Sequence, residues 1–461
     1  MAASASCLTE TPLGVGMKHC GILCAAVLAA PLWAQEPLSL SDAVRMAVQK
    51  HPAVEASAAK LRAADARIEQ ARSGRLPRVN YQESWMRSDN PVFVFGSLLT
   101  QHQFTERNFD VRFLNRPDFL NNFQSTITVD QPIYDARQTK SMTAAANLGK
   151  EIAGEDDRLT KQNLIANVVR AYFGAVVAVE ALKVAGEAVK SAEADLQRAE
   201  TIRAAGMATD ADVLSIKVHL AAMREKQIQR ANELEVARAA LNEAIGLPLD
   251  AKHDLTTPLT PAALRELEAS AEKMALDLRP EVRQLRLAAR VAETQIQAAK
   301  GAMLPQVFFR AGFEADRQEF IRKGGANWMF GATLRWNLFN GYADKQRIAE
   351  ASQNLTATQA QLKQMQSGVQ LQVRNAKSNL SSARERIQVA QAAVAMAEES
   401  LRITKNRYEA GLATVTDLLR NETALLETKM RLLAAVYDER LAATAVSLAA
   451  GTLTPESEVL K

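Results

Sequence analysis

The chain has 461 residues, carries a formal net charge of +4, and contains 23% charged but only 5% aromatic residues. No block of five or more Lys and Arg residues occurs, so the composition gives no indication of a nucleic-acid partner. The histidines after residue 34 have no metal-ligand spacing, and no phosphate loop or nucleophile motif is present. These features argue against an enzyme, a metal site and a bound cofactor.

The first 34 residues have the pattern of an export signal. Met17 and Lys18 precede an apolar run over 21–32, and Trp33-Ala34 follow it. A basic residue, a short apolar stretch and a small residue at its end are typical of a cleaved secretory signal peptide. All three cysteines lie in this leader, so we expect no disulfide in the mature chain. No later run approaches 18 apolar residues, so a membrane would have to be crossed by strands.

A duplication organises the rest of the chain. Residues 51–79 align without gaps to residues 279–307, and a second block repeats 205 positions apart. Each copy is predicted to contain a helix, a strand pair, a long helix, a turn and a shorter helix. The predicted ranges are repeat 1 over 38–250 (strand pair 77–133, long helix 136–205, helix 210–245), an inter-repeat segment over 247–278, repeat 2 over 279–453 (strand pair 305–339, long helix 341–410, helix 414–450) and a tail over 454–461.

Both long-helix segments have a heptad rhythm of small apolar residues, which predicts coiled-coil packing. The residues that follow this rhythm in the first segment are Leu182, Ala185, Val189, Ala192, Leu196 and Ala199. At about 1.5 Å per residue, such a helix would extend roughly 105 Å, several times the ~30 Å of a bilayer core. Each long helix is predicted to end at a C-capping glycine, Gly206 or Gly411.

A Leu-Pro pair precedes each strand pair. Pro77 and Pro305 should end their helices, because proline lacks an N–H and excludes the preceding residue from helical geometry. The windows that follow contain most of the aromatic residues and alternate apolar with polar side chains, as transmembrane β-barrel strands do. A soluble two-faced sheet is the alternative for the strands taken alone. The side chains expected to face lipid are Tyr81, Trp85, Phe309, Phe313, Trp328 and Trp336.

Four strands cannot close a barrel, so a membrane-spanning chain would have to oligomerise. The paired Leu-Pro breaks, the turns QPIYDAR and WNLFNGY, and the turns AGMATDADVL and AGLATVTDLL together resemble the TolC-type outer-membrane efflux proteins of Gram-negative bacteria. The resemblance implies a mixed α/β membrane protein, in which long helices form a coiled-coil α-barrel. It also implies that four strands from each chain of a homotrimer form a twelve-stranded β-barrel in outer-membrane lipid.

In function, the resemblance implies an exit duct in the outer membrane that extends into the periplasm. An inner-membrane pump of the RND, ABC or MFS type and a periplasmic adaptor would dock at its tip, and small molecules or proteins would leave through it. The alternative is a periplasmic coiled-coil adaptor or scaffold that never enters a membrane. The loop over 89–121 would lie on the extracellular side, because both flanking strands lead to periplasmic helices.

The tip would be formed by the turns Gly206-Met207 and Gly411-Leu412, where the adaptor is expected to dock. By spacing, Thr209 with Asp212 and Thr414 with Asp417 each fit a capping box that opens the next helix. The resemblance implies a second role, in which Asp417 lines the closed aperture and Tyr408 is tied to the carboxylate of Asp212. Arg420 departs from the family, which has a second acid there, so a cation-selective tip is not expected by default.

Overall fold

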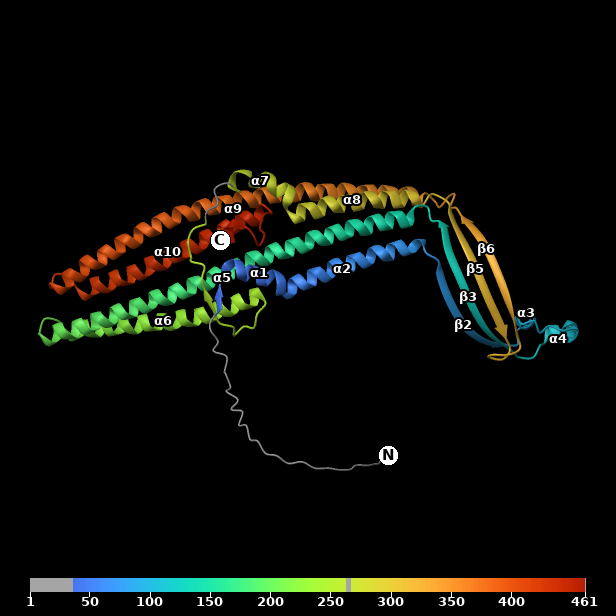
Figure 1. Ribbon diagram of the computed structural model, residues 1–461, viewed down its shortest axis with the longest axis horizontal. Coiled ribbons are helices and arrows are strands. Elements are labelled where there is room, and N and C mark those ends of the chain that lie inside the picture. The colour runs from blue at the N-terminus through green and yellow to red at the C-terminus, as the bar shows by residue number, and fades with distance from the viewer. Residues whose placement is uncertain (1–35, 263–266, 461) are drawn as a thin grey trace, which may run out of the picture.

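The computed structural model describes residues 36–460 apart from 263–266. The predicted leader lies outside these residues. The molecule is a long bundle of helices with one β-sheet at one end, joined to the helices at an angle (Figure 1). The predicted combination of very long helices with four strands in a sheet is confirmed.

The elements follow one another in the same order in the two halves of the chain. The first half contains β1 (Glu36–Leu38), α1 (Leu40–Lys50), α2 (Pro52–Arg72), η1 (Ser73–Arg75), β2 (Arg78–Ser88), α3 (Pro91–Thr100), η2 (Glu106–Phe109), α4 (Val111–Asn115), β3 (Leu120–Tyr134), α5 (Gln138–Ala204) and α6 (Asp210–Ile245). The second contains β4 (His253–Leu255), α7 (Leu267–Leu278), α8 (Pro280–Gly301), β5 (Gln306–Arg317), β6 (Gly324–Arg335), α9 (Ala343–Glu409), α10 (Val415–Ala449) and η3 (Glu458–Leu460).

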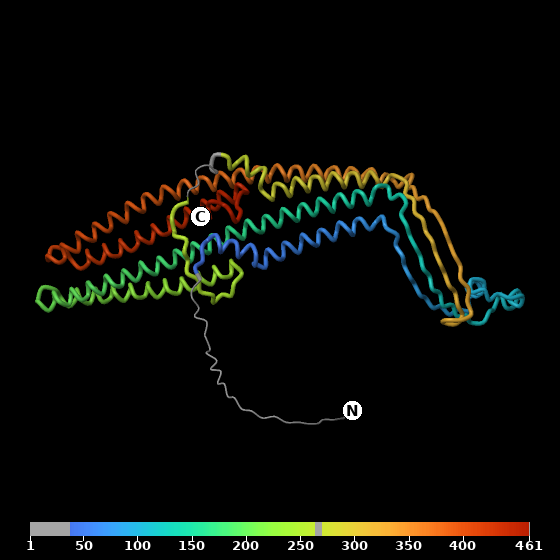
Figure 2. The backbone as a smooth tube through the Cα atoms, viewed as in Figure 1, coloured from blue at the N-terminus to red at the C-terminus, as the bar shows by residue number. Residues whose placement is uncertain are grey.

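The helices form two zones along the bundle (Figure 2). Toward the sheet, α2, α5, α8 and α9 lie side by side as neighbouring helices. Toward the opposite end, α5 packs on α6 and α9 packs on α10, so that two helical hairpins form the tip. With 67 residues each, α5 and α9 run through both zones and span roughly 100 Å.

The sheet is antiparallel, with strand order β2-β3-β5-β6. Its register places Tyr81 opposite Ile127, Ile127 opposite Phe313, and Phe313 opposite Trp328, so these four side chains form one row on the same face. The other face carries the polar partners in the alternation, such as Thr128. Among the described residues, β2 and β6 each pair on one side only, which leaves both edges of the sheet open.

Between the two zones lies the hydrophobic core, which is centred on the fully buried Tyr172 and Phe173 of α5. The Tyr172 hydroxyl donates to the Leu38 carbonyl at 2.8 Å and accepts from the Thr257 N–H at 2.9 Å. These bonds hold the short parallel pair β1–β4, which the sequence did not indicate. The predicted tail also belongs to the core, because Leu460 in η3 is only 2% exposed.

One expectation about helices needs correction. An 18-residue window of α5 has a mean hydropathy of 1.6 and few charges, which is enough by composition for a membrane span. However, 56% of that window is buried inside the structure. The apolar side chains of α5 thus contribute to the core of the helical bundle, where a buried helix has the same composition as a span.

Each Leu-Pro pair lies directly between helix and strand. Leu76 has extended geometry, with φ −88° and ψ 154°, and β2 begins one residue after Pro77. Pro305 likewise stands between the end of α8 and the start of β5. On the return path, Arg137 and Tyr342 have left-handed φ values of 65° and 68° at the starts of α5 and α9. The chain therefore turns from bundle to sheet and back in equivalent ways in the two halves.

Candidate functional site

The two tip turns have the same backbone geometry. Gly206 and Gly411 have φ values of +76° and +73°, a conformation that favours glycine. The Met207 N–H donates to the Ile202 carbonyl at 3.0 Å, and the Leu412 N–H donates to the Arg407 carbonyl at 2.8 Å. These bonds satisfy the last carbonyls of α5 and α9. They also leave the side chains of Met207 and Leu412 exposed at the end of the molecule.

The next residues form two capping boxes, as the spacing predicted. The Thr209 N–H donates to the Asp212 carboxylate at 3.0 Å, and the Asp212 N–H donates to the Thr209 hydroxyl at 3.2 Å. Thr414 and Asp417 repeat this pair at 3.2 Å in both directions. Bonds from the Thr414 hydroxyl and N–H lower the pKa of Asp417, and Arg420 lowers it further. Both acids therefore stabilise the start of a helix.

Tyr408 lies in a small apolar cluster at the tip and is 9% exposed. Its hydroxyl forms no hydrogen bond with any residue in the described part of the chain. The expected Tyr408–Asp212 bond is therefore not formed here, since the Asp212 carboxylate accepts from Thr209 instead. Burial, and then the nearby Asp212 charge, raise the pKa of Tyr408, so the two groups are close without being bonded.

A cluster of buried charges lies further along the bundle, and sequence reasoning missed it. Asp195 of α5 is fully buried, and its carboxylate pairs with Lys405 of α9 at 2.9 Å and Arg198 of α5 at 3.0 Å. Beside it, Glu422 of α10 pairs with His219 of α6 at 3.2 Å. Each of the four tip helices thus supplies a charged or titratable group, and the cluster connects the two hairpins.

The two carboxylates of this cluster titrate as a pair. Burial, followed by the neighbouring Glu422, raises the pKa of Asp195 to about 6. Burial opposes ionisation of Glu422 too, but its interactions with His219, Asp195 and Ser191 outweigh burial and lower the pKa of Glu422 to about 2. The pair therefore holds one proton below about pH 6 and carries two negative charges above it.

The heptad pattern, rather than the duplication, contains the signal that could have placed Asp195 near a packed side of its helix. Asp195 corresponds to Ser400 in the second copy, and Glu422 corresponds to Lys217 in the first. Other positions nearby also change between the copies, for example Arg198 to Ile403, so the comparison of the two copies does not single out these acids. Asp195 follows the seam residue Ala192 by three positions, which places it near the packed side of the helix.

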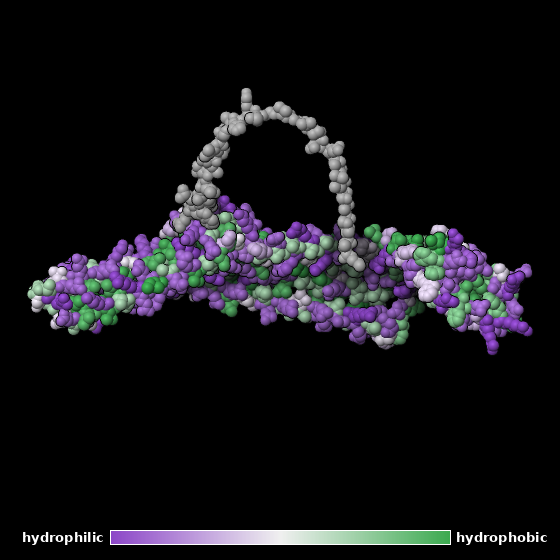
Figure 3. Space-filling model, turned by 90° about the horizontal axis from the view of Figure 1, so that it is seen from below, coloured by the Kyte–Doolittle hydropathy of each residue, from purple (hydrophilic) through white to green (hydrophobic). Residues whose placement is uncertain are grey.

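On the sheet, the aromatic residues gather on one face. Tyr81, Trp85 and Trp328 are 66%, 61% and 71% exposed, and Phe313 packs on Trp328 with ring centroids 4.7 Å apart. In the space-filling view, hydrophobic residues cluster over the strand end of the molecule, with hydrophilic residues beyond them (Figure 3). An exposed apolar sheet face of this kind is typical of strands that face lipid.

Two of the predicted lipid-facing aromatic residues differ from the others in exposure or position. Phe309 lies in β5 on this face and is 38% exposed. Trp336 lies one residue beyond the end of β6, so it is not part of the strand that the alternation predicted. Its indole N–H donates to the Met303 carbonyl at 3.2 Å, next to the break at Pro305. Trp336 therefore belongs to the junction between sheet and bundle.

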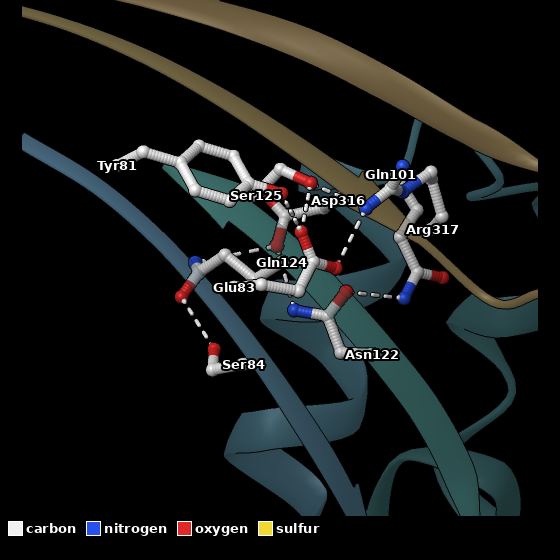
Figure 4. A network of polar contacts seen from close by, with 9 residues as sticks. All are labelled: Tyr81, Glu83, Ser84, Gln101, Asn122, Gln124, Ser125, Asp316 and Arg317. Carbon is white, nitrogen blue, oxygen red and sulfur yellow. Dashed lines mark hydrogen bonds and ion pairs between the residues drawn. The ribbon is translucent and has the colours of Figure 1, made fainter. Parts of the chain in front are cut away.

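The apolar face also holds an ion pair that sequence reasoning missed. Glu83 of β2 accepts from Arg317 of β5 at 2.8 Å, across the intervening β3 (Figure 4). Ser125 of β3 bridges them by bonding both, and the Tyr81 hydroxyl donates to Glu83 at 2.8 Å. The network pairs the two charges and connects three strands on the face that the aromatic residues cover, while the Arg317 Nε atom has no hydrogen-bond partner among the described residues.

Fold and surface together define an outer-membrane channel subunit, with a helical bundle at one end and membrane strands at the other. The sequence matches the family described as "Outer membrane efflux protein" over residues 43–247 and 272–452. The chain belongs to that family, which confirms the resemblance. It is an exit duct of an efflux or type I secretion system, located in the outer membrane and extending into the periplasm.

Relatives and solved structures agree with this assignment. The chain is 23% identical to the alkaline protease secretion protein AprF of Pseudomonas aeruginosa, over 90% of this chain and 85% of AprF. It is 22% identical to the outer membrane protein TolC of Salmonella enteritidis, over 91% and 83% of the two chains. A crystal structure of a membrane protein from Pseudomonas aeruginosa has a TM-score of 0.75 at 19% identity, covering 92% and 93%.

Proposed function

We propose that three copies of the chain close into one twelve-stranded barrel, with the helices forming a tunnel below it. The observation that carries this proposal is the four-stranded sheet, which has an apolar exposed face and two open edges. Unpaired backbone groups at an edge cost several kcal/mol each in lipid, so the edges must pair with other copies. The halves over 38–250 and 279–453 would each contribute one strand pair and one helical hairpin.

The tip would receive a periplasmic adaptor and, through it, an inner-membrane pump. The exposed Met207 and Leu412 support this part of the proposal, because they present apolar side chains at the end of each hairpin. The Asp417 and Arg420 side chains of the copies would then line the aperture. The chain would supply the passage and catalyse no reaction of its own. Cargo choice would belong to the pump, since AprF is named for protein secretion and the family for efflux.

Fractionation of cells that produce the full chain tests the proposal. We expect the protein in the outer-membrane fraction, soluble only in detergent, with a mass of three chains by native mass spectrometry. Boiling in SDS should convert this species to single chains. A protein that osmotic shock releases as a soluble species would contradict the membrane barrel and would favour the periplasmic scaffold. A detergent-extracted species of two chains would contradict the trimer alone.

A further inference from the structure

The inference concerns the loop between β2 and β3, and it rests on the proposed closed barrel. In such a barrel the apolar face of the sheet meets lipid, so the opposite, polar face lines the lumen. The loop begins at the ends of β2 and β3 that lie farthest from the helical bundle (Figure 1). Its first helix, α3, contacts β5 and β6 rather than extending freely into solvent.

The end of α3 is fastened to the lumen face by buried polar side chains (Figure 4). The Gln101 amide donates to the Asn122 side chain at 2.9 Å and to the Asn121 carbonyl at 3.0 Å. Asn122 in turn donates to the Asp316 carboxylate at 2.6 Å. Gln101 and Asp316 are fully buried, and both Asn122 and Asp316 alternate with lipid-facing residues along their strands. These three hydrogen-bonded side chains, Gln101, Asn122 and Asp316, are called the clamp, and they lie on the lumen side of the sheet.

A second contact holds α3 over β6. The Asn327 amide donates to the Thr100 carbonyl at 3.1 Å. A Cβ atom at Gly325 would come within 2.5 Å of the His102 ring, so this position of β6 admits the loop only because it is glycine. The contacts to β3, β5 and β6 lie at the extracellular ends of these strands. The helix therefore projects over the mouth of the barrel from inside its rim.

The two sides of α3 differ in burial. Val94 and Leu98 face the chain's own structure and are 2% and 6% exposed. Val92, Phe95 and Leu99, spaced three and four residues apart, form the opposite side and are 81%, 36% and 47% exposed. No charged residue occurs within α3. A hydrophobic helix side facing the water-filled mouth is unfavourable unless another surface covers it.

We propose that the exposed side of α3 is an interface between copies of this chain, where the three α3 helices meet at the barrel axis and narrow the extracellular mouth. The occupant is a second copy because the open edges of the sheet place other copies around the same axis. Each copy then carries its α3 on the lumen face at the same height, with Val92 and Leu99 directed away from its own strands. The duct has a constriction at each end.

Thiol cross-linking tests the contact between copies. The sequence has no cysteine after Cys24, so any cross-link formed by a chain without its leader must come from the single cysteine that is introduced. Val92→Cys should give covalent dimers with a short bis-maleimide in the purified, detergent-solubilised protein. Ile321→Cys is the matched control, because Ile321 is also 81% exposed but lies in the β5–β6 hairpin on the rim. It should give no cross-link.

Accessibility of the lumen tests the constriction. Thr128→Cys places a thiol on the lumen face, and a bulky impermeant maleimide added outside intact cells should label it slowly. Gln101→Leu removes the clamp and should raise the labelling rate several-fold, as should Leu99→Ser, which leaves the clamp intact. Gln103→Leu is the matched control and should leave the rate unchanged, because the Gln103 amide donates to no described residue other than Gln101, whose carbonyl lies at 3.5 Å.

The outcomes separate this inference from the function on which it rests. The constriction is overturned, and the duct is not, if the protein forms a closed trimer but Val92→Cys gives no cross-link and Gln101→Leu and Leu99→Ser leave the labelling rate of Thr128→Cys unchanged. Cross-linking of Val92→Cys to another envelope component in place of a second copy also overturns it. A protein that never forms a closed trimer overturns the proposed barrel, and the inference with it.

Discussion

The acids near the tip have two kinds of environment, and each determines what the acid can do. Asp212 and Asp417 are bonded to their capping threonines, so their carboxylates stabilise a helix start whether or not they also line an aperture. Asp195 and Glu422 are buried between hairpins, and each contacts a basic side chain of another helix, Lys405 for Asp195 and His219 for Glu422. The capping pairs follow from a local spacing. The buried cluster depends on how helices pack, and it was therefore not predicted.

The Asp195 carboxyl should make stability depend on pH. A raised pKa means that the folded state binds the proton more tightly than the unfolded chain does, so stability is lost as pH rises from the usual Asp value of 3.8 toward 6. The full change is on the order of 3 kcal/mol. Asp195→Asn mimics the protonated form, so the difference in Tm, wild type minus variant, should become more negative as pH rises through this window.

Circular dichroism at several pH values measures this difference. Asp417→Asn is the matched control. The pKa of the wild-type Asp417 carboxyl is lowered, so its contribution to stability is lost only at pH values below the usual Asp range. The difference in Tm between wild type and Asp417→Asn should therefore stay constant above about pH 4.5. A flat Asp195→Asn profile would show that Lys405 and Arg198 keep this carboxylate ionised throughout.

Arg420 should influence ion selectivity, because its exposed guanidinium lies near enough to lower the pKa of Asp417. Arg420→Asp would replace a mixed ring with an acidic one at the aperture, so cation preference should rise in single-channel recordings. Arg431→Asp, on the same helix three turns further from the tip, is the control and should shift the reversal potential less. Unchanged selectivity would place Arg420 outside the pore.

At the scale of elements, a glycine with left-handed geometry follows both the long helix α9 and the shorter helix α10, and the surroundings of the two glycines differ. A Cβ added at Gly411 would point into open space among the described residues, whereas one at Gly451 would lie 2.9 Å from the Arg279 backbone nitrogen. Both have left-handed φ values, so alanine costs about 1–2 kcal/mol at either position. Gly451→Ala should lower the Tm more than Gly411→Ala, because it adds a backbone clash. Equal Tm losses would mean that the Arg279 segment moves freely.

The ion pair across β2, β3 and β5 offers a second prediction at this scale. Arg317→Met leaves the Glu83 charge unpaired in the middle of a lipid-facing strand. Glu83→Gln leaves Arg317 at the strand end, where a long side chain can reach water. The temperature at which the SDS-resistant oligomer dissociates should therefore fall most in Arg317→Met, and less in Glu83→Gln. The dissociation temperature of the double variant should be closer to that of wild type than the temperature of Arg317→Met is. If the losses of the two single variants simply add in the double variant, Glu83 and Arg317 are not energetically coupled.

For the whole molecule, the duplication predicted most of the architecture. Paired Leu-Pro breaks, alternating strands and heptad helices are each local patterns, and their repetition in order identified the family. The sequence did not reveal the β1–β4 pair, the buried η3 or the packing of α3 against the sheet. Each of these depends on contacts between distant segments, such as Gln101 with Asn122, or Tyr172 with Leu38 and Thr257. No periodic signal accompanies such contacts.

The two ends of the molecule should respond differently to the same kind of change. Leu412 at the tip and Val111 in α4 are 68% and 69% exposed. Leu412→Asp should weaken co-purification of the adaptor and reduce export, because it places a charge on the proposed docking surface. Val111→Asp should leave both unchanged, and both variants should keep the trimer. Normal adaptor recovery with Leu412→Asp would move the docking surface away from the turn.

A hydrogen bond between the start of the first half and the start of the second half has a consequence for folding during synthesis. The Leu40 N–H donates to the Thr257 hydroxyl 217 residues later, beside the β1–β4 pair. At a synthesis rate of roughly 5–20 residues per second, the earlier partner waits on the order of 10–40 s for the later one to be made. The start of the described chain therefore cannot reach its native position early.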